Sequence, residues 1–200
     1  MPNWCYNELT VSGETETLKQ FLDACMGLPA RYPPVILENG QTLFGSPEYT
    51  EKRFCFNALI PTPDEVLAIG YDAHDKVSLE DMANVLLGKK AGQLDGYHWN
   101  IANWGTKWDI YCDGITLEDT GWTEGCDSVT FDFETAWSPP VAWLQTAAAR
   151  YPELTFKLHY EEAGCCFAGD ILGEAGETTD FPYNDDQLSE LFDWADEEDA

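Results

Sequence analysis

The segment from Trp99 to Asp109, WNIANWGTKWD, holds the densest group of residues in this sequence that can take part in chemistry. Tryptophan rings can stack on a planar ligand, while a lysine and an aspartate can hold its polar groups. The candidate pocket residues are Trp99, Asn103, Trp104, Lys107, Trp108 and Asp109. In a competing interpretation, Trp104 and Trp108 pack in the core and Lys107 pairs locally with Asp109, because aromatic residues dominate core energetics.

The 200-residue chain is strongly acidic, with ten Lys and Arg against 37 Asp and Glu and a net charge of −27. Direct binding to nucleic acid or to an anionic membrane needs a basic surface, so both are disfavoured. The charge is also uneven. Residues 1–107 carry 14 acidic and eight basic residues, whereas residues 108–200 carry 23 and two. This split favours an acidic surface built for a purpose, because solubility alone does not require it.

Fixed carboxylates on a folded protein can compete with DNA for a basic groove, because DNA itself binds through closely spaced negative charges. The leading hypothesis is therefore a non-enzymatic interaction protein that mimics nucleic acid. It would occlude a basic host protein, such as a nuclease or another nucleic-acid-binding protein. The alternative is that acidity only keeps the protein soluble and monomeric. The candidate partner-binding residues are Asp132, Glu134, Glu161, Glu190, Asp193, Asp196, Glu197 and Glu198.

Motifs for catalysis or for metal and cofactor binding are missing from the sequence. It has no GxSxG, P-loop or GxGxxG pattern, and its three histidines have no zinc-ligand spacing. Seven cysteines, an odd number without a CxxC pair, disfavour a disulfide framework. We therefore assign no catalytic residue, metal or cofactor. The start of the chain lacks the features of a signal peptide and no apolar run is long enough to span a membrane, so we expect a cytoplasmic protein.

The elements that must position these residues follow from hydrophobic periodicity. Alternating patterns predict strands that share one sheet, and apolar residues at helical spacing predict two helices on one face of that sheet. The expected helices are residues 15–25 and 140–150, the second capped by Ser138. A hairpin partner is expected at residues 165–172, and a strand broken at Gly105 within residues 99–113. The expected sheet strands are residues 4–12, 52–59, 129–135 and 154–160.

This order of elements predicts an α+β ferredoxin-like sandwich, with an antiparallel sheet and two helices on one face. We expect it to occupy residues 1–175, with insertions at about 28–50 and 61–125. The second insertion would contain a short helix at residues 65–69 and another at residues 79–87. Residues 176–200 would form an acidic extension, whose helix docks through Leu188, Leu191, Phe192 and Ala195.

Four blocks in the sequence resemble the YubB-like ferredoxin-like family of plasmid and phage proteins. They are MPNWCYNELTVSG at the start, FNALIPTPDEV (residues 56–66), NWGTKWD (residues 103–109) and FDFETAWSPP (residues 131–140). The resemblance implies a ferredoxin-like fold and a setting in a mobile element. It implies no particular activity.

Overall fold

A five-stranded antiparallel sheet, with strand order β6-β1-β7-β8-β9, forms the body of the protein. The computed structural model describes residues 3–32, 35–36, 42–43, 50–72, 94–110 and 115–192. The sheet strands are β1 (Trp4–Ser12), β6 (Ser128–Ala136), β7 (Thr155–Glu162), β8 (Phe167–Glu174) and β9 (Glu177–Pro182). Two small two-stranded sheets lie outside it: β2 (Met26–Gly27) with β5 (Arg53–Phe54), and β3 (Val35–Ile36) with β4 (Thr42–Leu43).

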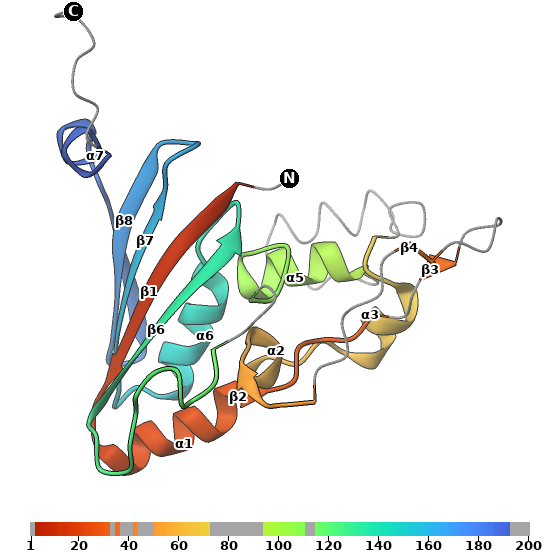
Figure 1. The fold of residues 1–200 in the computed structure, drawn as a ribbon, viewed down its shortest axis with the longest axis horizontal. Helices are drawn as coiled ribbons and strands as arrows, with labels where there is room; N and C mark the ends of the chain where they lie inside the picture. The colour runs from red at the N-terminus through yellow and green to blue at the C-terminus, as the bar shows by residue number, and fades with distance from the viewer. Residues whose placement is uncertain are drawn as a thin grey trace, which may run out of the picture.

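Two helices cover one face of the sheet, as predicted. Helix α1 (Thr15–Cys25) buries Leu18, Phe21, Leu22 and Cys25, and helix α6 (Val141–Arg150) buries Trp143, Leu144, Ala147 and Ala148. The Phe21 ring lies 6.4 Å from Trp143 and 5.5 Å from Phe156 of β7, so both helices meet the same layer of core side chains. Figure 1 shows α1, α6 and a further helix, α5 (Gly96–Trp104), on one side of the sheet. The α+β ferredoxin-like class predicted from the sequence is confirmed.

The predicted strand at residues 52–59 is wrong. Only Arg53 and Phe54 form a strand, and they pair with β2 instead of the main sheet. The chain then turns into the short helix α2 (Phe56–Leu59). Phe54 and Phe56 alternate and are both fully buried, which explains the strand-like pattern. The helical turn forms because the distant Asp109 carboxylate accepts the backbone N–H groups of Phe56 and Asn57.

The predicted strand within residues 99–113 is also wrong for its described part, residues 99–110, because its first part belongs to helix α5 (Gly96–Trp104). The Asp95 side chain accepts the N–H of His98 and caps the start of this helix. Gly105 ends it in the left-handed conformation, which glycine adopts without strain. The short helix α3 (Asp64–Ile69) confirms the one expected at residues 65–69, while the expected helix at 79–87 lies outside the described residues.

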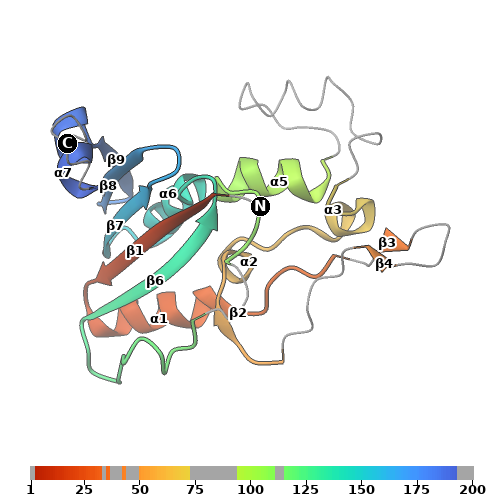
Figure 2. The ribbon, with the colours of Figure 1, turned by 45° about the horizontal axis from the view of Figure 1, so that its top comes forward.

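The sheet continues past residue 175, because β9 pairs with β8 along its whole length. Helix α7 (Asp185–Leu191) follows and starts at a capping box between Asn184 and Gln187. The expected docking of this helix through a buried stripe is not seen in its described part: α7 buries no residue, Leu191 is 38% exposed, and Leu188 and Phe192 are only half-buried. Ala195 lies outside the described residues. Figure 2 shows α7 beyond the end of β8 and β9, away from α1 and α6.

Candidate functional site

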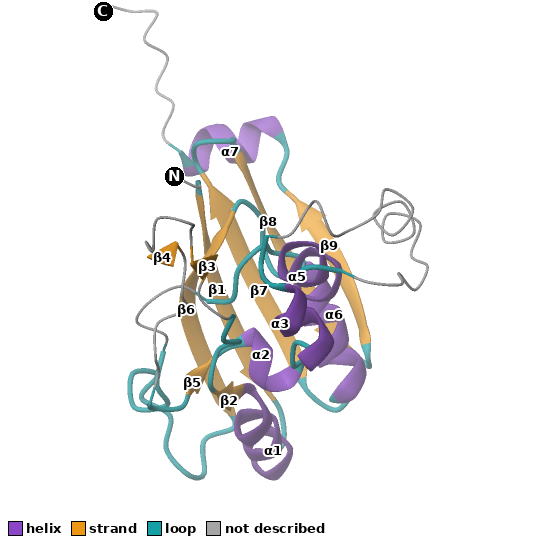
Figure 3. Cartoon of the chain, turned by 90° about the vertical axis from the view of Figure 1, so that its right-hand side faces the viewer, coloured by secondary structure: helices purple, strands orange, loops and turns teal. Residues whose placement is uncertain are grey.

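The second face of the sheet, opposite α1 and α6, is covered by no helix of the described part of the chain; we call it the open face. Side chains alternate between the two faces of a strand, so the partly or fully exposed residues of β1 and β6, and the residues of β7, β8 and β9 that lie opposite them, belong to the open face. The strand register then places these residues in rows that run across the strands. Figure 3 views the sheet from its other side, where the helices lie.

One row of the open face joins all five strands. Glu8 of β1 lies opposite Asp132 of β6 on one side and His159 of β7 on the other. His159 lies opposite Asp170 of β8, which lies opposite Phe181 of β9. The row therefore reads acid, acid, histidine, acid, phenylalanine. The Phe181 side chain is 52% exposed, so the row ends in an accessible aromatic ring.

The neighbouring row carries two further carboxylates. Tyr6 lies opposite Glu134 of β6 and Glu161 of β7. The Tyr6 hydroxyl donates a 2.8 Å hydrogen bond to Asp132, and this bond to a carboxylate raises the pKa of Tyr6 to about 12. The structure thus brings together three of the predicted partner-binding residues, Asp132, Glu134 and Glu161. It adds Glu8 and Asp170, which the alternation in their strands places on the same face.

A hollow of about 320 Å³ opens on this face and is lined by Glu8, Lys157, His159 and Asp170, among others. Asp170 links two strands here, because one carboxylate oxygen lies 2.9 Å from His159 Nδ1 and the other accepts the Tyr183 hydroxyl at 2.9 Å. His159 Nε2 also lies 3.8 Å from Glu161. These polar groups are exposed or half-exposed, so they can exchange their present contacts for those of a partner.

Glu162 follows Glu161 but points to the other face and has a structural role. It is 4% exposed, and its carboxylate accepts the backbone N–H groups of Gly164 and Cys165 in the β7–β8 turn. Burial opposes ionisation, yet the hydrogen bonds outweigh it and lower the pKa of Glu162. The two adjacent glutamates therefore differ: Glu161 belongs to the open face, and Glu162 stabilises the turn.

Of the other predicted partner-binding residues, the structure describes only Glu190, which does not join the rows. Glu190 is exposed on α7, at the end of the described chain. Asp193, Asp196, Glu197 and Glu198 lie outside the described residues.

The predicted pocket residues are divided between the core and the surface. Trp104 is fully buried, as the core interpretation expects, and its Nε1 donates to the Ile60 carbonyl at 3.1 Å. Trp99 packs edge-on against Trp104, with ring centroids 5.4 Å apart. Asn103 donates its side-chain amide to the Trp99 carbonyl one turn earlier in α5. These three residues build the helix and its contact with the core.

Lys107 and Trp108 lie at the surface, next to the start of β1. The Lys107 Nζ atom lies 4.1 Å from the Trp108 ring centroid and 5.7 Å from that of Trp137, and desolvation lowers the pKa of Lys107. Trp108 also contacts Trp4, whose side chain belongs to the open face. The expected pairing of Lys107 with Asp109 is not found: the lysine faces tryptophan rings, and the aspartate faces backbone N–H groups.

Asp109 anchors α2 from 53 positions along the chain. One carboxylate oxygen accepts the N–H groups of Phe56 at 2.7 Å and of Ile110 at 2.8 Å, and the other accepts that of Asn57 at 3.2 Å. Although part of the residue reaches the surface, its carboxylate is desolvated. Burial raises the pKa of Asp109 to about 6, against the effect of the three hydrogen bonds. The residue acts as a long-range helix cap.

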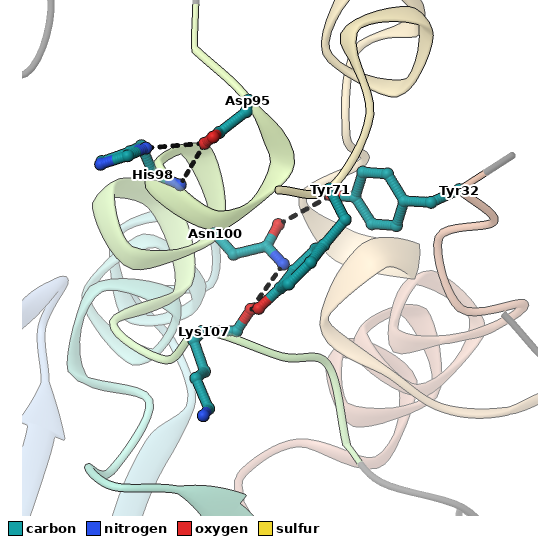
Figure 4. Close-up of polar contacts among 6 residues, drawn as sticks. All are labelled: Tyr32, Tyr71, Asp95, His98, Asn100 and Lys107. Atoms are coloured by element: carbon teal, nitrogen blue, oxygen red, sulfur yellow. Dashed lines mark hydrogen bonds and ion pairs between the residues drawn. The ribbon is translucent and has the colours of Figure 1, made fainter. Parts of the chain in front are cut away.

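A polar network that the sequence did not reveal supports the segment carrying Lys107 (Figure 4). The Asn100 amide donates to the Lys107 carbonyl at 2.9 Å, and the Tyr71 hydroxyl donates to the same carbonyl at 2.9 Å. Tyr32 donates to Asn100 from a third segment. Nearby, the buried Asp95 holds His98 through both its backbone N–H and its Nδ1 atom. Of this network, the sequence could have indicated only the helix cap, because Asp95 lies three residues before His98, the spacing typical of an N-cap.

Metal binding finds no support among the described residues, which contain no group of three His, Cys, Asp or Glu side chains able to hold an ion. The six described cysteines are free thiols: Cys5, Cys25 and Cys55 are buried, Cys126 is half-buried, and Cys165 and Cys166 are exposed. None of the described helices is long and apolar enough to cross a membrane.

Comparison with known proteins agrees with this fold. Residues 107–199 match the model of a ferredoxin-like domain in Api92-like protein. The crystal structure of api92 from Yersinia pseudotuberculosis is similar over 92% of this chain and 99% of its own, with a TM-score of 0.54 and 10% sequence identity. At that identity the likeness concerns the fold alone. No curated protein matches the sequence.

Proposed function

We propose that this protein binds a basic partner protein through the open face of its sheet and keeps nucleic acid out of the partner's binding groove. The observation that carries the proposal is the placement of Glu8 directly opposite Asp132. Like charges at facing positions on adjacent strands destabilise a sheet. An acidic pair retained there is more easily explained by an external positive charge than by stability or solubility.

The density of charge supports the same proposal. Strands lie about 4.8 Å apart and next-nearest residues on a strand about 7 Å apart. Five carboxylates, from Glu8, Asp132, Glu134, Glu161 and Asp170, therefore lie within a patch of about 14 Å by 7 Å. The same length of B-DNA axis carries about eight phosphates. On the open face of β1, β6, β7 and β8, only His159 and Lys157, which lies in the next row, carry basic side-chain nitrogen atoms.

The resemblance to YubB-like proteins supports a setting in a plasmid or phage, where blocking a host nuclease or restriction enzyme in the cytoplasm would be useful. In this proposal the partner also contacts the acidic tail, which includes Asp193, Asp196, Glu197 and Glu198 and lies outside the described residues. The alternative function, a ligand pocket around Trp104, Lys107 and Trp108, has less support. Trp104 is fully buried in the core and therefore not accessible to a ligand, and the Lys107 amine lies near the rings of Trp108 and Trp137 at the surface.

The test measures displacement of a fluorescent DNA duplex from purified basic DNA-binding proteins and nucleases, by anisotropy at low and high salt. We expect the native protein to displace the duplex from at least one of them, and less strongly as salt rises. The variant Asp132→Asn, Glu134→Gln, Glu161→Gln should bind about threefold to about 150-fold more weakly, because each exposed charge contributes about 0.2–1 kcal/mol.

The matched control removes the same number of charges elsewhere, with Glu14→Gln, Asp23→Asn and Glu153→Gln, all exposed and outside the open face. Equal weakening by both variants would mean that net charge alone attracts the partner, and would overturn the proposal. Absence of displacement for every protein tested would also count against it.

A further inference from the structure

The hydrogen-bond phase of the β1–β6 ladder determines which backbone groups of β6 face outward. Gly13 N donates to Asp127 O at one end of the ladder, and Trp137 N donates to Asn3 O at the other. In an antiparallel pair, residues alternate between exchanging hydrogen bonds with the partner strand and directing their N–H and C=O groups away from it. The odd-numbered residues of β6 therefore bond to β1. The even-numbered ones, such as Thr130, Asp132 and Glu134, direct their backbone groups to the outer edge.

This edge is available for pairing. β6 is the first strand in the sheet order, and within the described residues no backbone or side-chain hydrogen bond reaches the outward groups of Ser128, Thr130, Asp132 or Glu134. All four residues are exposed. Natural edge strands are usually protected by a proline, a bulge, short length or charged side chains, and the charges of β6, Asp132 and Glu134, repel acidic strands but attract basic ones. β6 has nine residues, pairs one-to-one with β1 throughout, and contains neither proline nor lysine. Figure 3 shows it at the margin of the sheet.

We propose that an extended, arginine-bearing segment of the partner adds to β6 as a sixth strand. The proposal rests on the basic partner proposed above and names the way in which that partner binds. Residues of the added strand that bond to β6 have side chains on the open face, beside those of Asp132 and Glu134. Arginine suits these positions, because its planar guanidinium group pairs with carboxylates through two parallel hydrogen bonds.

A second copy of this chain is a poor occupant of the same edge. Antiparallel pairing of two β6 strands would bring the acidic side chains of one copy next to those of the other, which destabilises a sheet. The opposite edge of the sheet is less suitable for a new strand. β9 has only six residues, ends at Pro182, and is followed directly by α7.

The test uses a synthetic nine-residue peptide that alternates arginine and threonine, (Arg-Thr)4-Arg, and the same peptide N-methylated at every arginine. Methylation keeps the charge but removes the N–H groups that would bond to β6. We expect the full-length protein to bind the unmethylated peptide at least tenfold more tightly. Equal affinity for the two peptides would overturn strand addition.

A variant of the protein makes the reciprocal change. Thr130→Pro removes one outward N–H at an edge position, where proline is tolerated, and Thr130→Ala is the matched control because both lose the side-chain contact with Thr10. Only Thr130→Pro should abolish the preference for the unmethylated peptide. If this variant does not fold, as judged by circular dichroism, the peptide pair still decides. The native protein could instead be a dimer that the Thr130→Pro variant converts to a monomer. This result would show that a second copy occupies the edge of β6, and it would also overturn the proposal.

Failure of this inference can be separated from failure of the proposed function. The two peptides could bind the native protein equally and both fail to bind the variant Asp132→Asn, Glu134→Gln, Glu161→Gln. That result would keep a basic partner on the open face but exclude strand addition. Binding of neither peptide at low salt, together with no displacement of DNA, contradicts both.

Discussion

Glu8 and Asp132 lie directly opposite each other on adjacent strands of the open face. Their repulsion is only partly relieved, because the Tyr6 hydroxyl donates to Asp132 and no described group donates to the Glu8 carboxylate. Glu8→Gln should therefore raise the free energy of unfolding by about 0.2–1 kcal/mol at pH 7 and low salt. Urea unfolding would measure this gain. Glu153→Gln, which removes an exposed charge outside the sheet, should leave stability almost unchanged. If Glu153→Gln stabilised the protein as much as Glu8→Gln, net charge rather than the Glu8–Asp132 pair would explain the gain.

The raised pKa of Asp109 predicts that this carboxyl group makes the free energy of unfolding fall as pH rises. Folding raises this pKa from 3.8 to about 6, so the folded state holds an extra proton between these values. The contribution of this proton to the free energy of unfolding is complete below pH 3.8, the pKa in the unfolded state, and is lost as pH rises through 6. Between pH 5 and pH 7.5 the loss amounts to about 1.4 kcal/mol.

Asp109→Asn cannot titrate and keeps one acceptor oxygen for the N–H groups of α2. Its stability relative to the native protein should therefore increase by about 1.4 kcal/mol from pH 5 to pH 7.5, measured by urea unfolding at each pH. Asp109→Ala loses the acceptor and should be less stable throughout this range. A constant difference between Asp109→Asn and the native protein would contradict the raised pKa.

Trp104 should behave as a core residue. It is fully buried and donates to the Ile60 carbonyl, so Trp104→Ala should lower the free energy of unfolding by about 3–5 kcal/mol. Trp104→Phe keeps most of the apolar contact but leaves that carbonyl without its donor, so a smaller loss of about 1–3 kcal/mol is expected. Thermal unfolding of the two variants would show the order. Unchanged stability with loss of partner or ligand binding would instead revive the pocket interpretation.

Cys166 has a φ of 57° in the turn between β7 and β8, a conformation that glycine adopts more readily than other residues. Cys166→Gly should be more stable than Cys166→Ala by about 1 kcal/mol, since both lose the exposed thiol and only the alanine keeps the strained Cβ. Differential scanning calorimetry under reducing conditions compares the two. Equal melting temperatures would mean that the turn relaxes around residue 166.

Much of the fold could be predicted from short-range pattern. The alternation in residues 4–12 and 129–135 specified β1 and β6, and the helical spacing of Leu18, Phe21, Leu22 and Cys25 specified α1 with its observed bounds. The Phe54 and Phe56 alternation failed as a strand signal because Phe54, Cys55 and Phe56 are all fully buried where β5 ends and α2 begins, so the alternation in residue type does not correspond to two faces. Asp109 decided between them, and no pattern near residue 56 contains that information.

The sequence by itself determined which residues of each strand share a face, since the alternation of side chains is a property of the strand alone. It thereby determined that Asp132 and Glu134 point the same way. Only the tertiary structure decided that β1 lies between β6 and β7, and that Asp132, Glu8, His159 and Asp170 form one row. Local propensity acts over a few residues, whereas strand order depends on contacts across more than a hundred, through a core shared by both halves of the chain.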